Sequence, residues 1–217
     1  MVTRTFRGSF TVLVPLLFLA ACAPGNKLHV PGELSRPPRP GGPPAGAPVA
    51  AVADFSYASD SPGVIGRDYD RVRQIVWKGE PGKAMADLVA GALTDGGSPA
   101  VRVPADAPAP ADVPVRISGS VRRFEVNARR SGVLNVLTEA TVTLVITASG
   151  PGVPPSWEST VTSGTTLTDM FPTPDDLREA LLSAANSAAE EAARRLLEGR
   201  VIPAPSAVDK GGGGTSR

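Results

Sequence analysis

The chain has little of the chemistry on which most enzymes depend. It contains one cysteine and one histidine in 217 residues. The histidine, His29, stands close to Pro31 in a proline-rich segment that we expect to lie outside the folded domain. A Ser-His-Asp triad, a Cys-His pair and a histidine metal site are therefore excluded from that domain. No glycine-rich phosphate-binding loop follows an expected strand. The sequence thus favours a protein that is not an enzyme and that has no cofactor and no metal site.

A strong excess of charge of one sign is also lacking. The formal net charge is +1, so no global field favours nucleic acid as a partner. Asp68 and Asp70 could bind a cation, but no further oxygen donors stand beside them at the spacing of a calcium loop. A solvated loop is the favoured interpretation of this pair.

No apolar run is long enough to cross a membrane. Ser9–Leu19 is apolar, whereas a membrane-spanning helix needs about 20 such residues. Arg4 and Arg7 precede this run without any acidic residue, and small residues follow it. This is the plan of a secretory signal peptide, which we place at residues 1–21. The alternatives are an ordinary signal peptide with an incidental cysteine and a short transmembrane helix.

The only cysteine, Cys22, directly follows Leu19-Ala20-Ala21. This segment resembles the lipobox of bacterial lipoproteins. The resemblance implies that the thiol receives a diacylglycerol and that Cys22 becomes the new N-terminus. Such lipoproteins typically carry three acyl chains, including palmitate, and stable anchoring needs at least two. Ala23 stands where an aspartate would retain the protein in the inner membrane of enteric bacteria. We therefore expect the periplasmic face of the outer membrane of a Gram-negative cell, with the inner membrane as the alternative.

Proline and glycine, 23 of each, cluster at two places. Residues 22–48 hold the lipidated cysteine and a proline-rich segment that has too few apolar residues to fold. We expect a tether there, which at about 3.1 Å per residue would hold the domain tens of ångströms from the membrane. Residues 201–217 include Gly211–Gly214 and are expected to form a disordered tail. Residues 49–200 remain as one domain of ordinary size.

Within that domain, apolar residues that recur at every second position predict strands. The expected strands are 49–57, 71–77, 115–121, 136–148 and 157–166, with a further short strand at 100–103. The apolar series changes parity between Val121 and Phe124, which predicts a β-bulge near Arg122 and Arg123.

Two helices are expected from apolar residues at helical spacing. The first runs from Lys83 and ends at Gly96-Gly97. The second has Thr173 as its N-cap, aspartates in its first turn and Gly199 at its end. This order predicts an α+β fold, with an antiparallel sheet of four to six strands and both helices on one face.

The layout resembles the YajG family of outer-membrane lipoproteins. The shared pattern is a lipobox, an early strand pair ending in Gln74-Ile75-Val76, the strand Val115–Val121 (VRISGSV), and a long strand ending in Ile146-Thr147-Ala148 before a helix over 175–197. The resemblance covers residues 49–200 and implies an α+β envelope lipoprotein without a defined activity. The same order resembles LptE and the auxiliary lipoproteins of lipid-transport ABC systems. The proline-rich tether and the glycine-rich tail depart from these families.

Arginines gather in residues 116–130, which would lie on one strand if Val115–Arg130 forms a single bulged strand, and they mark the candidate partner-binding site. Its members are Arg122, Arg123, Arg129 and Arg130, with Arg116 nearby. Guanidinium groups there would suit phosphate or carboxylate, as offered by lipopolysaccharide, peptidoglycan or an acidic envelope protein. The alternative is a solvated strand face that prevents aggregation. Trp157 and Phe171 could add an apolar contact, although core packing is their default.

The sequence therefore leaves two hypotheses for function. The favoured one is a non-enzymatic binding or scaffold subunit of the cell envelope, anchored by lipid and accessory to lipid or lipopolysaccharide transport or assembly. The alternative is an envelope hydrolase of an unrecognised type.

Overall fold

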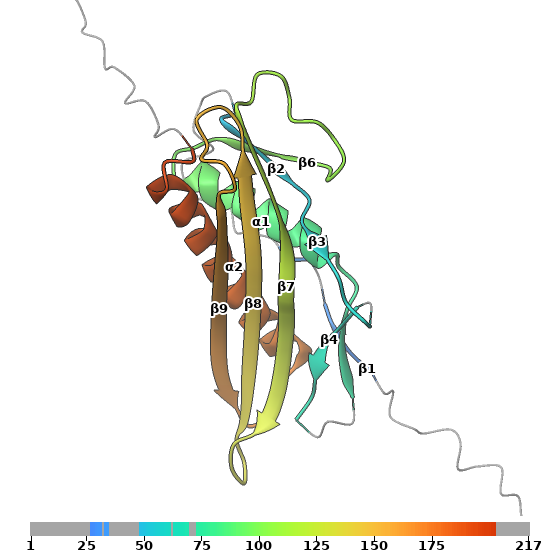
Figure 1. Ribbon diagram of the computed structural model, residues 1–217. Coiled ribbons are helices and arrows are strands. Elements are labelled where there is room, and N and C mark those ends of the chain that lie inside the picture. The colour runs from blue at the N-terminus through green and yellow to red at the C-terminus, as the bar shows by residue number, and fades with distance from the viewer. Residues whose placement is uncertain (1–26, 32, 35–47, 62, 70–72, 203–217) are drawn as a thin grey trace, which may run out of the picture.

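The computed structural model describes residues 27–31, 33–34, 48–61, 63–69 and 73–202. The expected α+β class is confirmed, with two helices, a mixed six-stranded sheet and a small second sheet (Figure 1). In chain order the elements are β1 (Lys27–Val30), β2 (Ala50–Ala53), β3 (Ser56–Tyr57), β4 (Val64–Arg67), β5 (Gln74–Trp77), α1 (Pro81–Asp95), β6 (Ala100–Val103), β7 (Val115–Arg130), β8 (Val136–Ser149), β9 (Glu158–Asp169) and α2 (Pro174–Glu198).

Three long strands form the body of the main sheet because their apolar residues alternate over many positions. In β8 every second residue from Val136 to Ala148 is buried. β8 lies between β7 and β9 and is antiparallel to both, so β9 is an edge strand. The register of β7 against β8 shifts between Val121 and Arg123. The predicted bulge is therefore confirmed.

The other half of the main sheet is parallel. Its strand order is β6-β2-β7-β8-β9, with β2 parallel to β6 and to β7, and β3 parallel to β7. The sequence predicts an antiparallel sheet, and this is wrong for β2, β3 and β6. The connection from β2 to β6 contains α1, and such a crossover brings the chain back in the same direction. The strand expected over 49–57 is also divided, at Asp54 and Phe55.

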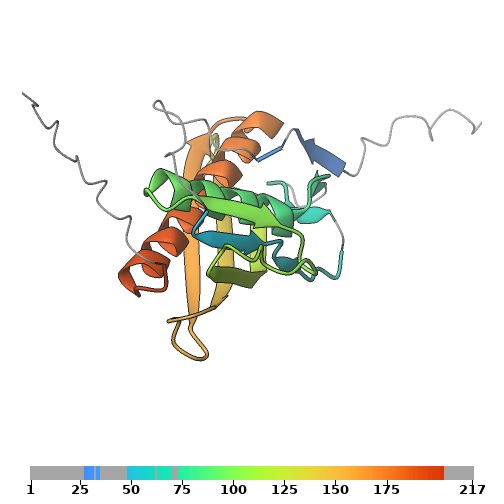
Figure 2. The same cartoon turned by 90° about the horizontal axis from the view of Figure 1, so that it is seen from above.

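α2 begins and ends where the sequence predicts. The Thr173 side chain accepts a hydrogen bond from the Asp176 backbone N–H at 3.3 Å, and the Asp176 carboxylate accepts one from the Thr173 N–H at 2.6 Å. The buried residues of α2 are mostly alanines, which lets the helix lie close to β8 and β9. α1 packs against α2, and the two helices cross each other in the view from above (Figure 2).

The small sheet has the order β1-β5-β4 and packs against β7 through β4. β1 pairs with β5 in parallel, from Lys27 opposite Gln74 to Val30 opposite Trp77. The sequence predicts an unfolded tether over 22–48, and this is wrong for β1 and for Leu34, which is buried. A four-residue strand that completes an existing edge needs no apolar core of its own, so composition does not reveal it.

The predicted tail over 201–217 also begins too early. Val201 and Ile202 are buried in the core, and the backbone N–H of each donates to the Leu196 carbonyl at the end of α2. Two apolar residues directly after a helix end pack against it readily. The described domain therefore reaches residue 202, and the rest of the expected tail lies outside the described residues.

In the described part of the chain, no helix covers the second face of β7, β8 and β9. This face carries threonines and serines, as in the Thr143–Thr162 and Ser118–Thr147 pairs, whose oxygens lie 3.1 and 3.0 Å apart. Threonine suits a strand that faces water, because it is β-branched and carries a hydroxyl. Neither described helix combines the length and the apolar character that crossing a membrane requires.

Candidate functional site

The bulge in β7 turns two arginines outward at one point. Val121 and Phe124 are both buried on the core side, and the two residues between them, Arg122 and Arg123, are both exposed. Arg123 keeps Thr143 as its partner across the ladder, whereas Arg122 is the extra residue. The sequence predicts this local geometry because the apolar parity changes there.

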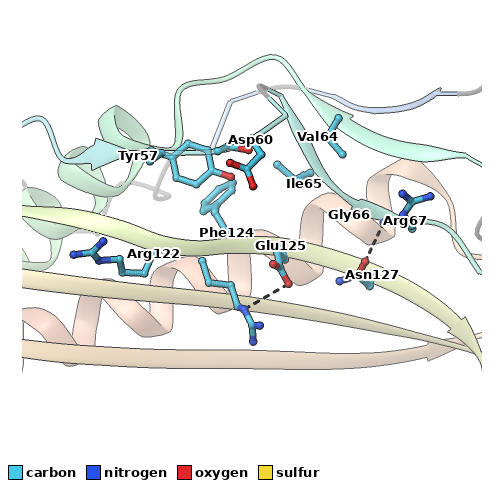
Figure 3. Close-up of a pocket in the computed structure, with 13 residues that line it drawn as sticks. Tyr57, Asp60, Val64, Ile65, Gly66, Arg67, Arg122, Phe124, Glu125 and Asn127 are labelled. Atoms are coloured by element: carbon cyan, nitrogen blue, oxygen red, sulfur yellow. Dashed lines mark hydrogen bonds and ion pairs between the residues drawn. The ribbon is translucent and has the colours of Figure 1, made fainter.

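Beside the bulge lies a cleft of about 420 Å³ between β4 and β7, which Figure 3 shows. β4 approaches β7 closely at Gly66, where a Cβ atom would lie 1.8 Å from the Val126 carbonyl oxygen. The Arg67 backbone N–H donates to the Asn127 side-chain oxygen at 2.9 Å. The lining residues come from the β3–β4 segment and from β7: Tyr57, Ala58, Ser59, Asp60, Val64, Ile65, Gly66, Arg67, Arg122, Arg123, Phe124, Glu125 and Asn127.

Aromatic packing fixes the wall of this cleft. The Phe124 ring stacks on Trp77, with centroids 5.2 Å apart, and meets the Tyr57 ring edge to face at 6.5 Å. Phe124 and Trp77 are buried, while Tyr57 is only partly buried. Tyr57 is therefore held in place by the core beneath it.

Cations outnumber anions around the cleft. In Figure 3, Arg122 and Arg67 stand at opposite ends of the labelled residues, with Asp60 between them. Arg123 lies 3.6 Å from the Glu125 carboxylate. Among the described residues, neither the Arg67 nor the Arg122 guanidinium has a hydrogen-bonding or ion-pair partner. Two arginines whose guanidinium groups lack a partner in the described part of the chain thus line one small cleft.

The other two predicted arginines lie elsewhere, near the end of β7. Arg129 forms a bidentate pair with Glu139, at 3.1 Å from Nε and 2.9 Å from Nη2. The hydrogen bonds from Arg129 hold the pKa of the Glu139 carboxyl below its usual range. The Arg130 guanidinium lies 5.4 Å from the centre of the Tyr69 ring. The four arginines therefore form two separate groups.

Arg116, the fifth arginine of the series, has a structural role. Its guanidinium donates to the carbonyls of Ala107 and Ala105, the latter at 2.7 Å. These carbonyls belong to the loop before β7, which packs on the outer side of β2. Arg116 therefore holds this loop in place.

The carboxylates, the histidine and the cysteine that the sequence offers as candidates lie away from this cleft or outside the described residues. Asp68 is buried and accepts a hydrogen bond from Arg73 Nε at 2.7 Å, so it belongs to the β4–β5 turn, while Asp70 lies outside the described residues. His29 is exposed on β1, inside the folded domain, because β1 adds to β5. Cys22 also lies outside the described residues. Among the described residues, no group of three metal-ligating side chains occurs.

The two aromatic residues proposed for an apolar contact behave differently. Trp157 is partly buried and packs against the core, as expected. Phe171 is 73% exposed, so the expectation that it packs in the core is wrong. It stands in the short connection between β9 and α2, whose strand and helix already fill the core beside it.

Sequence reasoning missed Tyr57, Asp60 and Arg67 as lining residues. They reach the cleft only because β3 pairs with β7 and β4 packs against it, some 60 residues away in sequence. Strands of two and four residues are too short to show a period of apolar residues, so the sequence does not predict this contact. Gly66, which stands between Ile65 and Arg67, is the one local sign of a close approach.

No protein-family model matches the chain, and no curated protein matches its sequence. Its fold is similar to the crystal structure of protein XCC0632 from Xanthomonas campestris, of family DUF330, with a TM-score of 0.51 and 18% identity, covering 81% of this chain and 96% of that one. PelC from Paraburkholderia phytofirmans, solved as a dodecamer, has a TM-score of 0.38 and 20% identity, covering 69% of this chain and 90% of PelC. A candidate lipoprotein from Caulobacter crescentus has a TM-score of 0.33 and 15% identity, covering 69% and 88% of the two chains. The similarity to XCC0632 shows a shared fold.

Proposed function

We propose that the protein is a lipid-anchored envelope lipoprotein that binds an anionic ligand in the cleft between β4 and β7. In this proposal it is a non-enzymatic subunit, accessory to the transport or assembly of lipid or lipopolysaccharide. Cys22 supplies the anchor, and Arg67 and Arg122 supply the charge. The observation that carries the proposal is that two arginines lining one small cleft have guanidinium groups without a partner among the described residues.

The chemistry of the cleft favours a phosphate or carboxylate group over a cation. Each guanidinium presents five N–H donors in a planar fork that matches two oxygens of such a group. The volume of about 420 Å³ falls in the range of small-molecule sites. It would accept a lipid head group or a sugar phosphate more readily than a whole acyl chain. Asp60 and Glu125 in the same lining would discriminate against ligands with several negative charges.

The hydrolase alternative would rest on these same two carboxylates. Carboxylic acids that act as general acids are usually kept protonated by burial in an apolar pocket. Asp60 is exposed, and the Glu125 side chain is 46% exposed and lies beside Arg123. Neither carboxylate therefore has the buried, apolar surroundings of such a general acid. We therefore prefer a binding role to a catalytic one.

The cleft is tested by titrating the solubilised full-length protein with a short-chain phosphatidylglycerol. Calorimetry should show binding that weakens at least tenfold in the Arg67→Ala/Arg122→Ala variant, because both unpaired cations are removed. Binding should also weaken with added salt, since exposed charges are screened. Arg194→Ala is the matched control, because this exposed arginine lies on α2 and pairs with Glu191 and Glu198. Equal affinity in all three proteins, or equal affinity for phosphatidylcholine, would refute the cleft as an anion site.

The anchor and its membrane need a separate test. Cys22→Ala should abolish membrane attachment, and globomycin should cause the uncleaved precursor to accumulate. On a density gradient, the wild-type protein should move with outer-membrane markers, given Ala23 after the cysteine. A Cys22→Ala protein that stays with membranes at high salt would contradict the anchor. Migration with inner-membrane markers would contradict only the proposed location.

A further inference from the structure

The lipid anchor of the proposed function, on which this inference rests, lies very close to the folded domain. β1 begins at Lys27, five residues after Cys22. A chain spans at most about 3.6 Å per residue, so Cys22 lies within about 18 Å of Lys27 whatever path the chain takes. The predicted separation of tens of ångströms from the membrane is therefore too large. The end of the domain that carries Lys27 must face the bilayer.

Strand pairing identifies that end. Lys27 lies opposite Gln74 at the start of β5, and Gln74 lies opposite Arg67 at the end of β4. β4 runs alongside β7 in the same direction, because Arg67 contacts Asn127 and Tyr69 contacts Arg130. Lys27 therefore lies at the end of the molecule where β7 finishes. In Figure 1 this end points downward, with β1 and β4 at the lower right.

The same end carries an exposed apolar surface. Arg130 pairs with Val136, and Val136 pairs with Asp169, so the β7–β8 hairpin and the β9–α2 connection lie together. The large apolar side chains that are exposed in the described part of the chain all belong to these two connections. They are Val133 (90% exposed), Leu134 (66%), Met170 (53%) and Phe171 (73%). We name these four residues the apolar tip.

The charges around the tip suit a membrane surface. Arg129, Arg130 and Lys27 lie at this end, and all three side chains are exposed. Of the acidic groups there, Glu139 is paired with Arg129, Asp169 accepts from the backbone of Met170 and Phe171, and Asp176 caps α2. Asp68, beside Tyr69, is paired with Arg73, and Asp175 lies in the first turn of α2. Cations beside apolar side chains are the combination that binds the interface of anionic lipids.

We propose that the apolar tip inserts into the interfacial layer of the bilayer that holds the Cys22 lipid. The anchor would fix the protein to the membrane, and the tip would fix its orientation, with the long strands directed away from the surface. The occupant is the lipid surface because the length of chain between Cys22 and Lys27 brings this end within reach of it. The convex shape of a hairpin tip also suits insertion better than the capture of a second protein.

The test uses cysteine labelling in the lipidated full-length protein. Acylation leaves no free thiol in the mature chain, so Leu134→Cys, Phe171→Cys and Ala111→Cys would each provide a single site for an environment-sensitive fluorophore. Ala111 is the control, because it is exposed in the loop before β7, at the opposite end of that strand. The proteins are reconstituted into phosphatidylethanolamine/phosphatidylglycerol vesicles with a quencher on the acyl chains.

Labels at positions 134 and 171 should be quenched at least threefold more than the label at 111, and all three proteins should float with the vesicles. Flotation with equal quenching at the three positions would refute insertion and leave the anchor intact. Failure to float would refute the anchor, and the inference with it. Crosslinking of position 134 to a protein in native membranes, with no quenching in vesicles, would also overturn the proposal in favour of a protein partner.

Discussion

Arg102 joins three elements through one guanidinium group. Its Nε donates to Asp54, after β2, at 2.5 Å, and its Nη1 donates to Asp87, on α1, at 2.9 Å. The hydrogen bond with Asp54 is the largest of the causes that raise the pKa of Arg102. The Asp54 side chain is only 15% exposed, so the loss of Arg102 would leave a largely buried carboxylate without its cation.

We therefore expect Arg102→Ala to lower the free energy of unfolding by about 1–3 kcal/mol, as for other buried groups that lose their partner. Urea denaturation followed by circular dichroism provides the measurement. Arg194→Ala, which removes an exposed arginine from α2, should change stability by less than about 0.5 kcal/mol. If both variants lose the same stability, Arg102 contributes only as a surface charge.

Gly66 is the residue on which the cleft depends. Any side chain there would meet the Val126 carbonyl, because a Cβ atom would lie 1.8 Å from that oxygen. Gly66→Ala should force β4 away from β7, at a cost of about 1–3 kcal/mol, as for other overpacked sites. It should also weaken anion binding in the cleft.

Gly132 offers a matched control for this substitution, because a Cβ atom there would meet nothing within 4 Å. Gly132→Ala should leave unfolding and binding nearly unchanged in the same denaturation and titration experiments. If Gly66→Ala were equally neutral, β4 would not be held against β7 as the structure shows.

Among the elements, α2 has an N-terminal cap whose contribution to stability depends on pH. Hydrogen bonds from the Thr173 backbone and hydroxyl lower the pKa of Asp176. Because the folded pKa is depressed, the carboxylate stabilises the fold above its unfolded pKa of about 3.9. This contribution is lost as the pH falls through the folded pKa. Asp176 is only partly buried and this hydrogen bond is exposed, so the effect should be modest.

Asp176→Asn should therefore destabilise the protein more at pH 7 than at pH 2.5. The measurement is the difference in unfolding free energy between wild type and variant at the two pH values. Asp175→Asn is the control, since no hydrogen bond from Thr173 to Asp175 is seen among the described residues. A difference for Asp176→Asn that stays constant between pH 2.5 and 7 would show that the carboxylate does not act through its charge.

The elements that the sequence predicts best are those with local signals. α2 has a cap, a proline and a stripe of small residues, and the bulge in β7 follows from a change of apolar parity. The missed elements are β1 and β4, which have four residues each, and the sequence does not separate the two-residue β3 from β2. Such strands are formed by pairing with an existing edge, a tertiary effect that overrides local preference. The cleft was missed for the same reason, because one of its walls is built from β4.

At the scale of the whole molecule, the cleft and the apolar tip follow one another along β7, toward the end of the domain that carries Lys27. Arg122 stands partway along β7, and Arg67 stands at the end of β4, on the same side as Lys27. If the tip meets the bilayer, the Arg67 end of the cleft is the end nearer to the lipid head groups. A ligand that leaves the membrane would then reach Arg67 before Arg122. The short distance from anchor to domain is what maintains this arrangement.

That distance can be altered without touching the domain. Inserting ten glycine and serine residues after Ala23 adds a flexible segment with an end-to-end distance of about 17 Å. Acylation and flotation should be unchanged, because Cys22 and the residues before it are intact. Quenching of a label at Leu134→Cys should fall, since a longer linker lowers the effective concentration of the tip at the surface. Anion binding by the solubilised protein should stay the same, because neither Arg67 nor Arg122 is altered. If quenching were independent of linker length, the tip would bind the membrane strongly on its own, and orientation would not depend on the anchor.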